Sequence, residues 1–208
     1  MSIRNIIFDY GNVIANIPPE TILKIFMDLG ITQETQAKHR DRIKHLMHDF
    51  IDGIRPMDDV LNDILVYCKS GVTLPQIRAI ITDLQGEISA ERLHTIVKLR
   101  KKYKVYLLSN INEVIWANCV QCMMNLGYTV PDLFDEIFLS CRMGIAKPDP
   151  RIYKQMIEKT HMIPEESLFL DDREDNCEAA EKLGIHASWV KQNEVEQNAD
   201  YIQLAQNA

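Results

Sequence analysis

From residue 91 onward, strand-like apolar runs alternate with helical segments, and this alternation restricts the fold more than any other feature of the chain. In order, the runs read KVYLLSN, DEIFLS, SLFLDD and HASWV. An earlier run at residues 6–8 is apolar without polar alternation, which is typical of a strand covered on both faces. The pattern predicts an α/β fold with a doubly wound parallel sheet, in which residues 6–8 form the first strand.

Residues 18–85 have a different texture, with helical periodicity and no convincing strand. Apolar side chains recur there at steps of three and four residues in four segments: Ile22, Ile25, Phe26 and Leu29; Ile43, Leu46, Met47 and Phe50; Val60, Leu61, Ile64 and Leu65; Ile77, Ile80, Ile81 and Leu84. We therefore expect a helical cap domain of residues 17–86, inserted into an α/β core domain of residues 1–16 and 87–208. Pro18, Pro19 and Gly86 are candidate hinges at its ends.

The charge of the chain restricts its partners. Lysine plus arginine total 23 against 30 aspartate plus glutamate, a net charge of −7, so no electrostatic footprint for nucleic acid or an anionic membrane is visible. No run has the length of a membrane span, and a signal peptide would have to place Asp9 inside its apolar region. We expect a cytosolic protein with no nucleic-acid or membrane partner, whose five cysteines are reduced thiols.

Polar residues follow the expected strands where each one ends. Asp9 comes directly after residues 6–8, and Ser109 and Asn110 end the run LLSN. Because the carboxyl ends of parallel strands meet at one edge of the sheet, these side chains should line one crevice. Ser109 and Asn110 are short hydrogen-bond donors that suit phosphate oxygens. Lys147, in a loop whose prolines fix the backbone, supplies a positive charge for the same phosphate.

The run LFLDD ends in two adjacent carboxylates, Asp171 and Asp172, and Asp175 and Asn176 follow closely. Adjacent carboxylates repel each other unless a cation lies between them. Together with Asp9 they predict an all-oxygen Mg²⁺ site at the same edge of the sheet. A turn or a helix cap would explain each residue alone, but four such motifs at successive strand ends favour one common site.

These motifs resemble those of the haloacid dehalogenase-like hydrolases, a resemblance that covers residue 3 to about residue 190. Its parts are Asp9 in FDYGNV, Ser109 and Asn110 in LLSN, Lys147 in AKPDP, and the acidic pair in LFLDD. The helical insert is similar to the cap of that superfamily. Within it, FDYGNVI, GEISAERL, LLSNIN and KPDPRIY look most like the alpha-D-glucose-1-phosphate phosphatase branch.

The resemblance implies a catalytic role for each motif. Asp9 would attack phosphorus and form an aspartyl-phosphate, which water then hydrolyses. Ser109 and Lys147 would hold the oxygens of the transferred phosphoryl group, and the backbone amides of Tyr10 and Gly11 would add hydrogen-bond donors. The substrate would be a small phosphorylated metabolite.

The resemblance also implies a ligand set for magnesium. Mg²⁺ would bridge Asp9 and the phosphate. Asp172 would be the side-chain ligand from the acidic pair, with Asp171 beside it, and the carbonyl of Gly11 would complete the protein ligands. Asn176 would orient these ligands, with Asp175 next to it.

One position departs from the superfamily pattern. Most of its phosphatases carry a second aspartate two residues after the nucleophile, where this chain has Gly11. Losing a general acid and base costs roughly a hundredfold to ten-thousandfold in rate. A sugar 1-phosphate such as glucose 1-phosphate is less demanding than an alkyl phosphate, because its anomeric oxygen is a better leaving group than an ordinary alcohol. The glycine at position 11 therefore favours a sugar 1-phosphate as the substrate. The alternative is a catalytically weak phosphate-binding or regulatory protein of the same fold.

Overall fold

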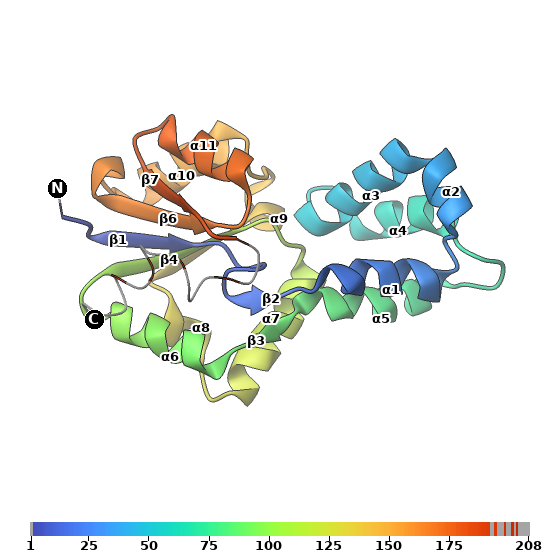
Figure 1. Ribbon diagram of the computed structural model, residues 1–208, viewed down its shortest axis with the longest axis horizontal. Coiled ribbons are helices and arrows are strands. Elements are labelled where there is room, and N and C mark those ends of the chain that lie inside the picture. The colour runs from blue at the N-terminus through green and yellow to red at the C-terminus, as the bar shows by residue number, and fades with distance from the viewer. Residues whose placement is uncertain (1, 192–193, 195–197, 199–200, 202, 204–208) are drawn as a thin grey trace.

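A computed structural model describes residues 2–191, 194, 198, 201 and 203 of the chain. Its centre is a five-stranded sheet in the order β5-β4-β1-β6-β7, with every neighbouring pair parallel (Figure 1). The strands are β1 (Asn5–Phe8), β4 (Lys104–Ser109), β5 (Glu136–Leu139), β6 (Ser167–Asp171) and β7 (His186–Trp189). The predicted α/β fold with a parallel sheet is confirmed, and β1 lies in the middle of the sheet, as expected for a strand that is buried on both faces.

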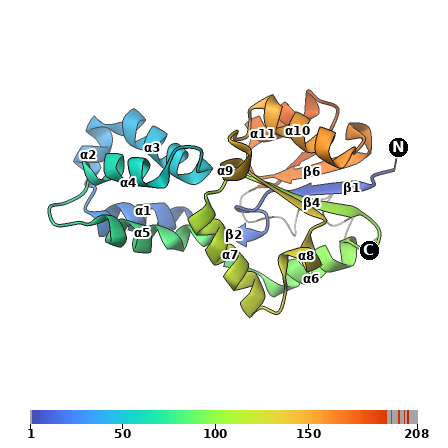
Figure 2. The same ribbon diagram turned by 180° about the vertical axis from the view of Figure 1, so that it is seen from behind.

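Helices cover both faces of the sheet. On one side lie α6 (Ala90–Leu99), α7 (Glu113–Asn125) and α8 (Val130–Leu133); on the other lie α10 (Pro150–Thr160) and α11 (Glu174–Glu181) (Figures 1 and 2). Successive β1 side chains point to opposite faces, so Ile6 and Phe8 pack in one apolar cluster while Ile7 packs in the other. Two short helices, α9 (Ser140–Met143) and η2 (Pro164–Glu166), lie in the connections.

A helical lobe stands beside the sheet, at the edge where the strands end (Figures 1 and 2). It consists of α1 (Pro19–Leu29), α2 (Gln33–Lys38), α3 (Arg40–Asp52), α4 (Met57–Leu65), α5 (Leu74–Ile81) and η1 (Thr82–Gln85). Helices were predicted in four of these segments, and α1, α3, α4 and α5 confirm them. The sequence did not indicate α2, because that helix buries no residue and has no apolar spacing.

A short antiparallel ribbon joins the lobe to the sheet. It pairs β2 (Ala15–Asn16) with β3 (Glu87–Ile88), two-residue strands that are too short for a detectable pattern. Gly86 has a φ of +72°, and a Cβ atom there would lie 2.7 Å from the carbonyl oxygen of Asn16, so glycine is required. The chain thus crosses between the two parts as a hydrogen-bonded pair of strands.

The carboxyl-terminal end of α3 is fastened to the sheet edge. Ser140 Oγ donates a 2.6 Å hydrogen bond to the carbonyl of Asp52, and Asn112 Nδ2 donates a 2.9 Å hydrogen bond to the carbonyl of Phe50. Gly53 follows with a φ of +63°, and a Cβ atom there would lie 2.8 Å from Asn112. These contacts fix the last turn of α3 next to the ends of β4 and β5.

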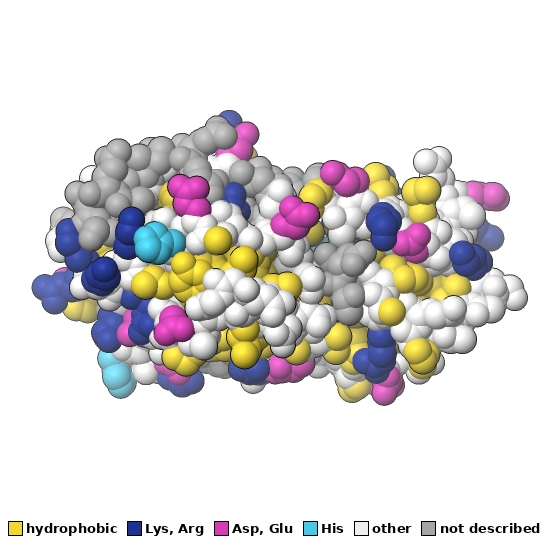
Figure 3. Space-filling model, turned by 90° about the horizontal axis from the view of Figure 1, so that it is seen from below, with side chains coloured by type: hydrophobic (Ala, Val, Ile, Leu, Met, Phe, Trp, Pro, Cys, Tyr) yellow, Lys and Arg dark blue, Asp and Glu magenta, His cyan; other side chains and the backbone are white. Residues whose placement is uncertain are grey.

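The surface carries both signs of charge. On the face shown in Figure 3, basic side chains gather at the end away from the helical lobe, whereas over the lobe they are mixed with acidic ones. Among the residues that the structure describes, every helix is too short or too polar to span a lipid bilayer. The helical lobe thus has no surface region of a single charge sign on the face shown in Figure 3.

Candidate active site

Lys147 connects three of the strand ends. Its side chain is 1% exposed, and its ammonium donates hydrogen bonds to Asp9 Oδ1 at 2.7 Å, to the carbonyl of Leu108 at 2.8 Å and to Asp171 Oδ2 at 2.6 Å. These partners lie at the ends of β1, β4 and β6. The structure therefore brings together the lysine and two of the aspartates that the sequence placed at this edge.

Burial sets the ionisation of this group. The pKa of Asp9 is raised to about 7: removal from water raises it, the contact with Lys147 lowers it, and the charges of Asp171 and Asp172 raise it. Burial disfavours the ammonium of Lys147, but the two carboxylates it contacts raise its pKa above the ordinary value. Lys147 is thus positively charged at neutral pH, while Asp9 beside it still has a raised pKa, which a bound metal ion would lower.

Three carboxylates form a cluster that suits magnesium. Asp9, Asp171 and Asp172 each offer one oxygen, and these oxygens all lie within 4.8 Å of one another. Hard oxygen ligands of this kind are those that Mg²⁺ prefers. Asp9 Oδ2 and Asp172 Oδ1 form no hydrogen bond within the described part of the chain, so both are available to an ion. The residues present fit a magnesium ion.

Asp171 is held by protein groups on both of its oxygens. Oδ1 accepts hydrogen bonds from the backbone amide of Arg173 at 2.9 Å and from Asn176 Nδ2 at 2.9 Å, and Oδ2 accepts Lys147. Asn176 is 3% exposed, and its hydrogen bond to Asp171 places it where a residue that orients the acidic pair is expected. Asp175 lies at the surface, where it pairs with Arg173 at 2.6 Å.

Asn12 is a site residue that the sequence analysis missed. Its Nδ2 donates a 2.8 Å hydrogen bond to Asp172 Oδ2, and its Oδ1 accepts one from the backbone amide of Ile17. The backbone of Asn12 has a φ of 57°, a region that asparagine tolerates better than most residues. Its position directly after Gly11 was the signal, since asparagine in such a turn supports a special backbone conformation.

A cavity of about 180 Å³ opens beside Asp9 and is lined by Tyr10, Gly11, Ser109 and Asn110. The hydroxyl of Ser109 forms no hydrogen bond within the described residues and is available to a phosphate oxygen. Asn110 exchanges two hydrogen bonds with the backbone of Lys147, at 2.9 and 2.8 Å, and so fixes that loop. The Tyr10 hydroxyl donates its hydrogen bond to the carbonyl of Gln85 at 2.9 Å.

The helical lobe adds a carboxyl to this edge. Asp52 ends α3, and its side chain lies near the amide of Asn110 and the charge of Arg173. Burial raises the pKa of Asp52 to about 6, against the opposing effects of Arg173 and Asn110. The sequence analysis did not select this residue, because it lies at the end of an ordinary amphipathic helix.

Comparison with known proteins identifies the family. Residues 3–184 match the family model described as haloacid dehalogenase-like hydrolase. The chain belongs to the haloacid dehalogenase-like hydrolases. It is also 30% identical over 185 residues to a D-ribitol-5-phosphate phosphatase of Bacteroides thetaiotaomicron, an alignment that covers 88% of this chain and 89% of the relative.

Solved structures of other haloacid dehalogenase-like hydrolases share the whole fold. A family enzyme from Bacteroides thetaiotaomicron superposes with a TM-score of 0.83 at 29% identity, covering 92% of this chain and 95% of that one. The same enzyme, in complex with magnesium and inorganic phosphate, gives a TM-score of 0.78. A predicted family hydrolase from Porphyromonas gingivalis gives 0.79 at 30% identity, covering 92% of this chain and 93% of that one.

Proposed function

We propose that this hydrolase is a magnesium-dependent phosphatase that cleaves the phosphate monoester of a small metabolite through an aspartyl-phosphate. The observation that carries the proposal is the contact of Lys147 with both Asp9 and Asp171, beside a cavity with a free Ser109 hydroxyl. A relative named as a phosphatase and a similar structure with magnesium and phosphate support it. We also propose that the protein is cytosolic and that residues 17–86 form a cap domain on a core domain of residues 1–16 and 87–208.

Each site residue has a distinct role in the proposed hydrolysis. A carboxylate oxygen of Asp9 forms a bond to phosphorus while the bond to the leaving oxygen breaks, and water then cleaves the aspartyl-phosphate. Lys147, the Ser109 hydroxyl and the amides of Tyr10 and Gly11 stabilise charge on the phosphoryl oxygens. Asp9, Asp172 and the Gly11 carbonyl would hold a magnesium ion, which would supply the charge neutralisation that lets one anion approach another.

The substrate class follows from the missing acid at Gly11. A sugar phosphate whose alcohol leaves easily, such as glucose 1-phosphate, needs less protonation than an alkyl phosphate. The phosphatase relative favours a second candidate, because D-ribitol 5-phosphate is an ester of a primary alcohol. Hydrolysis of such an ester at a useful rate requires a proton donor.

Steady-state kinetics with Mg²⁺ distinguish these candidates. We expect kcat/KM to be higher for p-nitrophenyl phosphate and glucose 1-phosphate than for glucose 6-phosphate and D-ribitol 5-phosphate, because leaving-group acidity replaces the missing acid. Equal values for the two glucose phosphates would contradict this ranking and indicate Asp52 as the proton donor. In that case Asp52→Asn should lower kcat for glucose 6-phosphate more than for p-nitrophenyl phosphate.

Restoring a carboxyl at residue 11 should raise the activity on alkyl phosphates. Gly11 has no left-handed backbone, and a Cβ atom there would lie 3.3 Å from the terminal methyl of Ile17 and 3.9 Å from Asp9 Oδ2. A side chain fits there once that methyl group shifts by a few tenths of an ångström. We expect Gly11→Asp to increase kcat/KM for glucose 6-phosphate by about tenfold to a hundredfold. Gly11→Asn is the matched control, since it has the same shape but cannot transfer the proton.

The alternative of a phosphate-binding or regulatory protein makes a different prediction. Such a protein would bind phosphate with Mg²⁺ but release none from any ester in the panel. Turnover of p-nitrophenyl phosphate that depends on Mg²⁺ would exclude it.

A further inference from the structure

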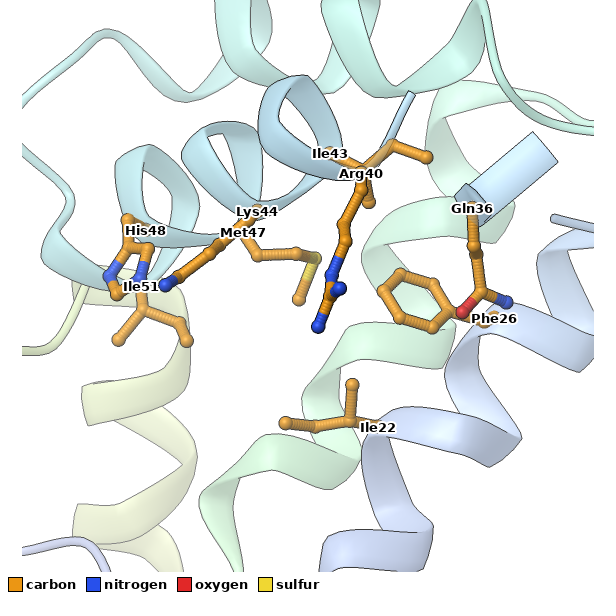
Figure 4. A pocket seen from close by; sticks show the side chains of 9 residues that line it. All are labelled: Ile22, Phe26, Gln36, Arg40, Ile43, Lys44, Met47, His48 and Ile51. Carbon is orange, nitrogen blue, oxygen red and sulfur yellow. The ribbon is translucent and has the colours of Figure 1, made fainter. Parts of the chain in front are cut away.

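A groove with a volume of about 380 Å³ runs between α1 and α3 of the helical lobe. In Figure 4, Ile22 and Phe26 of α1 face Met47 and Ile51 of α3 across it. These side chains give the groove an apolar lining, although it is open to solvent. Such a lining suits the hydrocarbon part of a ligand.

The groove adjoins the active-site cavity. Ile22 and Ile51 line both, so the two hollows meet at these side chains. The last turn of α3 is held to the sheet edge by the hydrogen bonds from Ser140 and Asn112, which fix this junction. A phosphate ester bound at Asp9 would direct its alcohol part into the groove.

Two cations face the groove without partners. Arg40 and Lys44 line it, and neither forms an ion pair within the described part of the chain. The other arginines of the lobe are all paired: Arg42 with Asp63, Arg55 with Asp49 and Asp63, and Arg78 with Asp58. An unpaired arginine beside an apolar lining indicates an anionic group on the ligand.

Arg40 lies far from the reacting end. It begins α3 and Ile51 lies near its end, about three turns or about 16 Å along the helix axis. His48 lies between them, and burial lowers its pKa, with Arg173 and Lys44 adding to the effect, so its imidazole is neutral at physiological pH. A ligand that spans the groove thus passes the apolar side chains of Phe26 and Met47, with the cation Lys44 beside them, before it reaches Arg40 at the far end.

We infer that the groove binds the alcohol part of an elongated phosphate monoester, with an apolar chain between the phosphate and an acidic end group at Arg40. This inference rests on the proposed phosphatase activity and extends its substrate class from a single sugar phosphate to a longer ester. The alkyl esters compared below share one kind of leaving group, so the missing acid at Gly11 lowers their rates alike and their ratios report on the groove. A single sugar ring would occupy only the cavity beside Asp9 and leave Arg40 without a partner.

Three esters test the length and the acidic end: butyl phosphate, decyl phosphate and ω-carboxydecyl phosphate, with p-nitrophenyl phosphate as the reference. We expect kcat/KM to rise at least about tenfold from butyl to decyl phosphate, because the longer chain buries more apolar surface. We expect a further rise of about threefold to tenfold for the carboxylate, mainly through a lower KM.

Variants assign these effects to the groove. Arg40→Gln should remove the preference for ω-carboxydecyl over decyl phosphate. Arg42→Gln is the matched control on the same helix; because that arginine pairs with Asp63, it should retain the preference. Met47→Asp places a negative charge in the groove and should raise the KM of both long esters, and melting temperatures show whether each variant is folded.

The outcomes separate the inference from the proposed function. Turnover of p-nitrophenyl phosphate without any gain from butyl to decyl phosphate would overturn the inference and leave the phosphatase intact. A higher kcat/KM for decyl than for butyl phosphate, without a further rise for ω-carboxydecyl phosphate, would overturn the assignment of an acidic end group to the substrate. Binding of a second copy of the chain or of a vesicle to the groove, with substrate kinetics unaffected by Arg40→Gln and Met47→Asp, would also overturn it. Absence of turnover with every ester would refute the proposed function together with the inference.

Discussion

Asp9→Asn is expected to lower phosphate release by about four to six orders of magnitude while the protein stays folded. An amide has the shape of the carboxylate but is a poor nucleophile, so no aspartyl-phosphate can form. Lys147 keeps its contacts with Asp171 and with the carbonyl of Leu108, so the strand ends remain connected. The measurement is phosphate release from p-nitrophenyl phosphate at saturating Mg²⁺, together with circular dichroism. Turnover near the wild-type rate would remove Asp9 from the mechanism.

Stability as a function of pH provides an independent test of Asp9. Its pKa is about 7 in the folded chain, against 3.8 for an ordinary aspartate. Between these values the folded state binds more protons than the unfolded state, so stability falls as the pH rises. Without Mg²⁺, the melting temperature should therefore be lower at pH 8 than at pH 5, and Asp9→Asn should reduce this difference. Asp41→Asn, at an exposed position of α3 that forms no ion pair within the described residues, serves as the control and should leave the difference unchanged.

The sequence predicted the parts of the site that depend on strand ends. Asp9, Ser109 and Asp171 each directly follow or end a buried apolar run, and parallel strands bring those ends to one edge whatever the details of packing. Lys147 could be added because its loop precedes a helix with a proline at its first position. The parallel sheet and the edge that carries these residues therefore followed from local sequence patterns.

Contacts between distant segments were not predictable in this way. Asp52 reaches the site because α3 is fastened to Ser140 and Asn112, and the groove is lined by side chains from α1, α2 and α3 together. The β2–β3 ribbon pairs strands of two residues each, which have no period to detect. In each case the deciding interaction joins parts of the chain that are far apart in sequence.

Lys147→Met is expected to have the second largest effect, on both stability and activity. The variant leaves Asp9 and Asp171 buried without the cation that faces both, which costs about 3–5 kcal/mol of unfolding free energy. Activity should fall by about a hundredfold to a thousandfold, because the ammonium no longer stabilises phosphoryl charge. Lys154→Met, an exposed position on α10, is the matched control and should change neither quantity.

The dependence of this loss on conditions distinguishes an electrostatic role from simple packing. If Lys147 neutralises the carboxylates, Mg²⁺ should stabilise Lys147→Met more than it stabilises the wild type, because the ion becomes the main positive charge in the cluster. The loss should also be smaller at pH 5 than at pH 8, since Asp9 takes up a proton below about 7. A loss of stability that is equal at both pH values and insensitive to Mg²⁺ would instead assign to Lys147 the role of filling space between β1, β4 and β6.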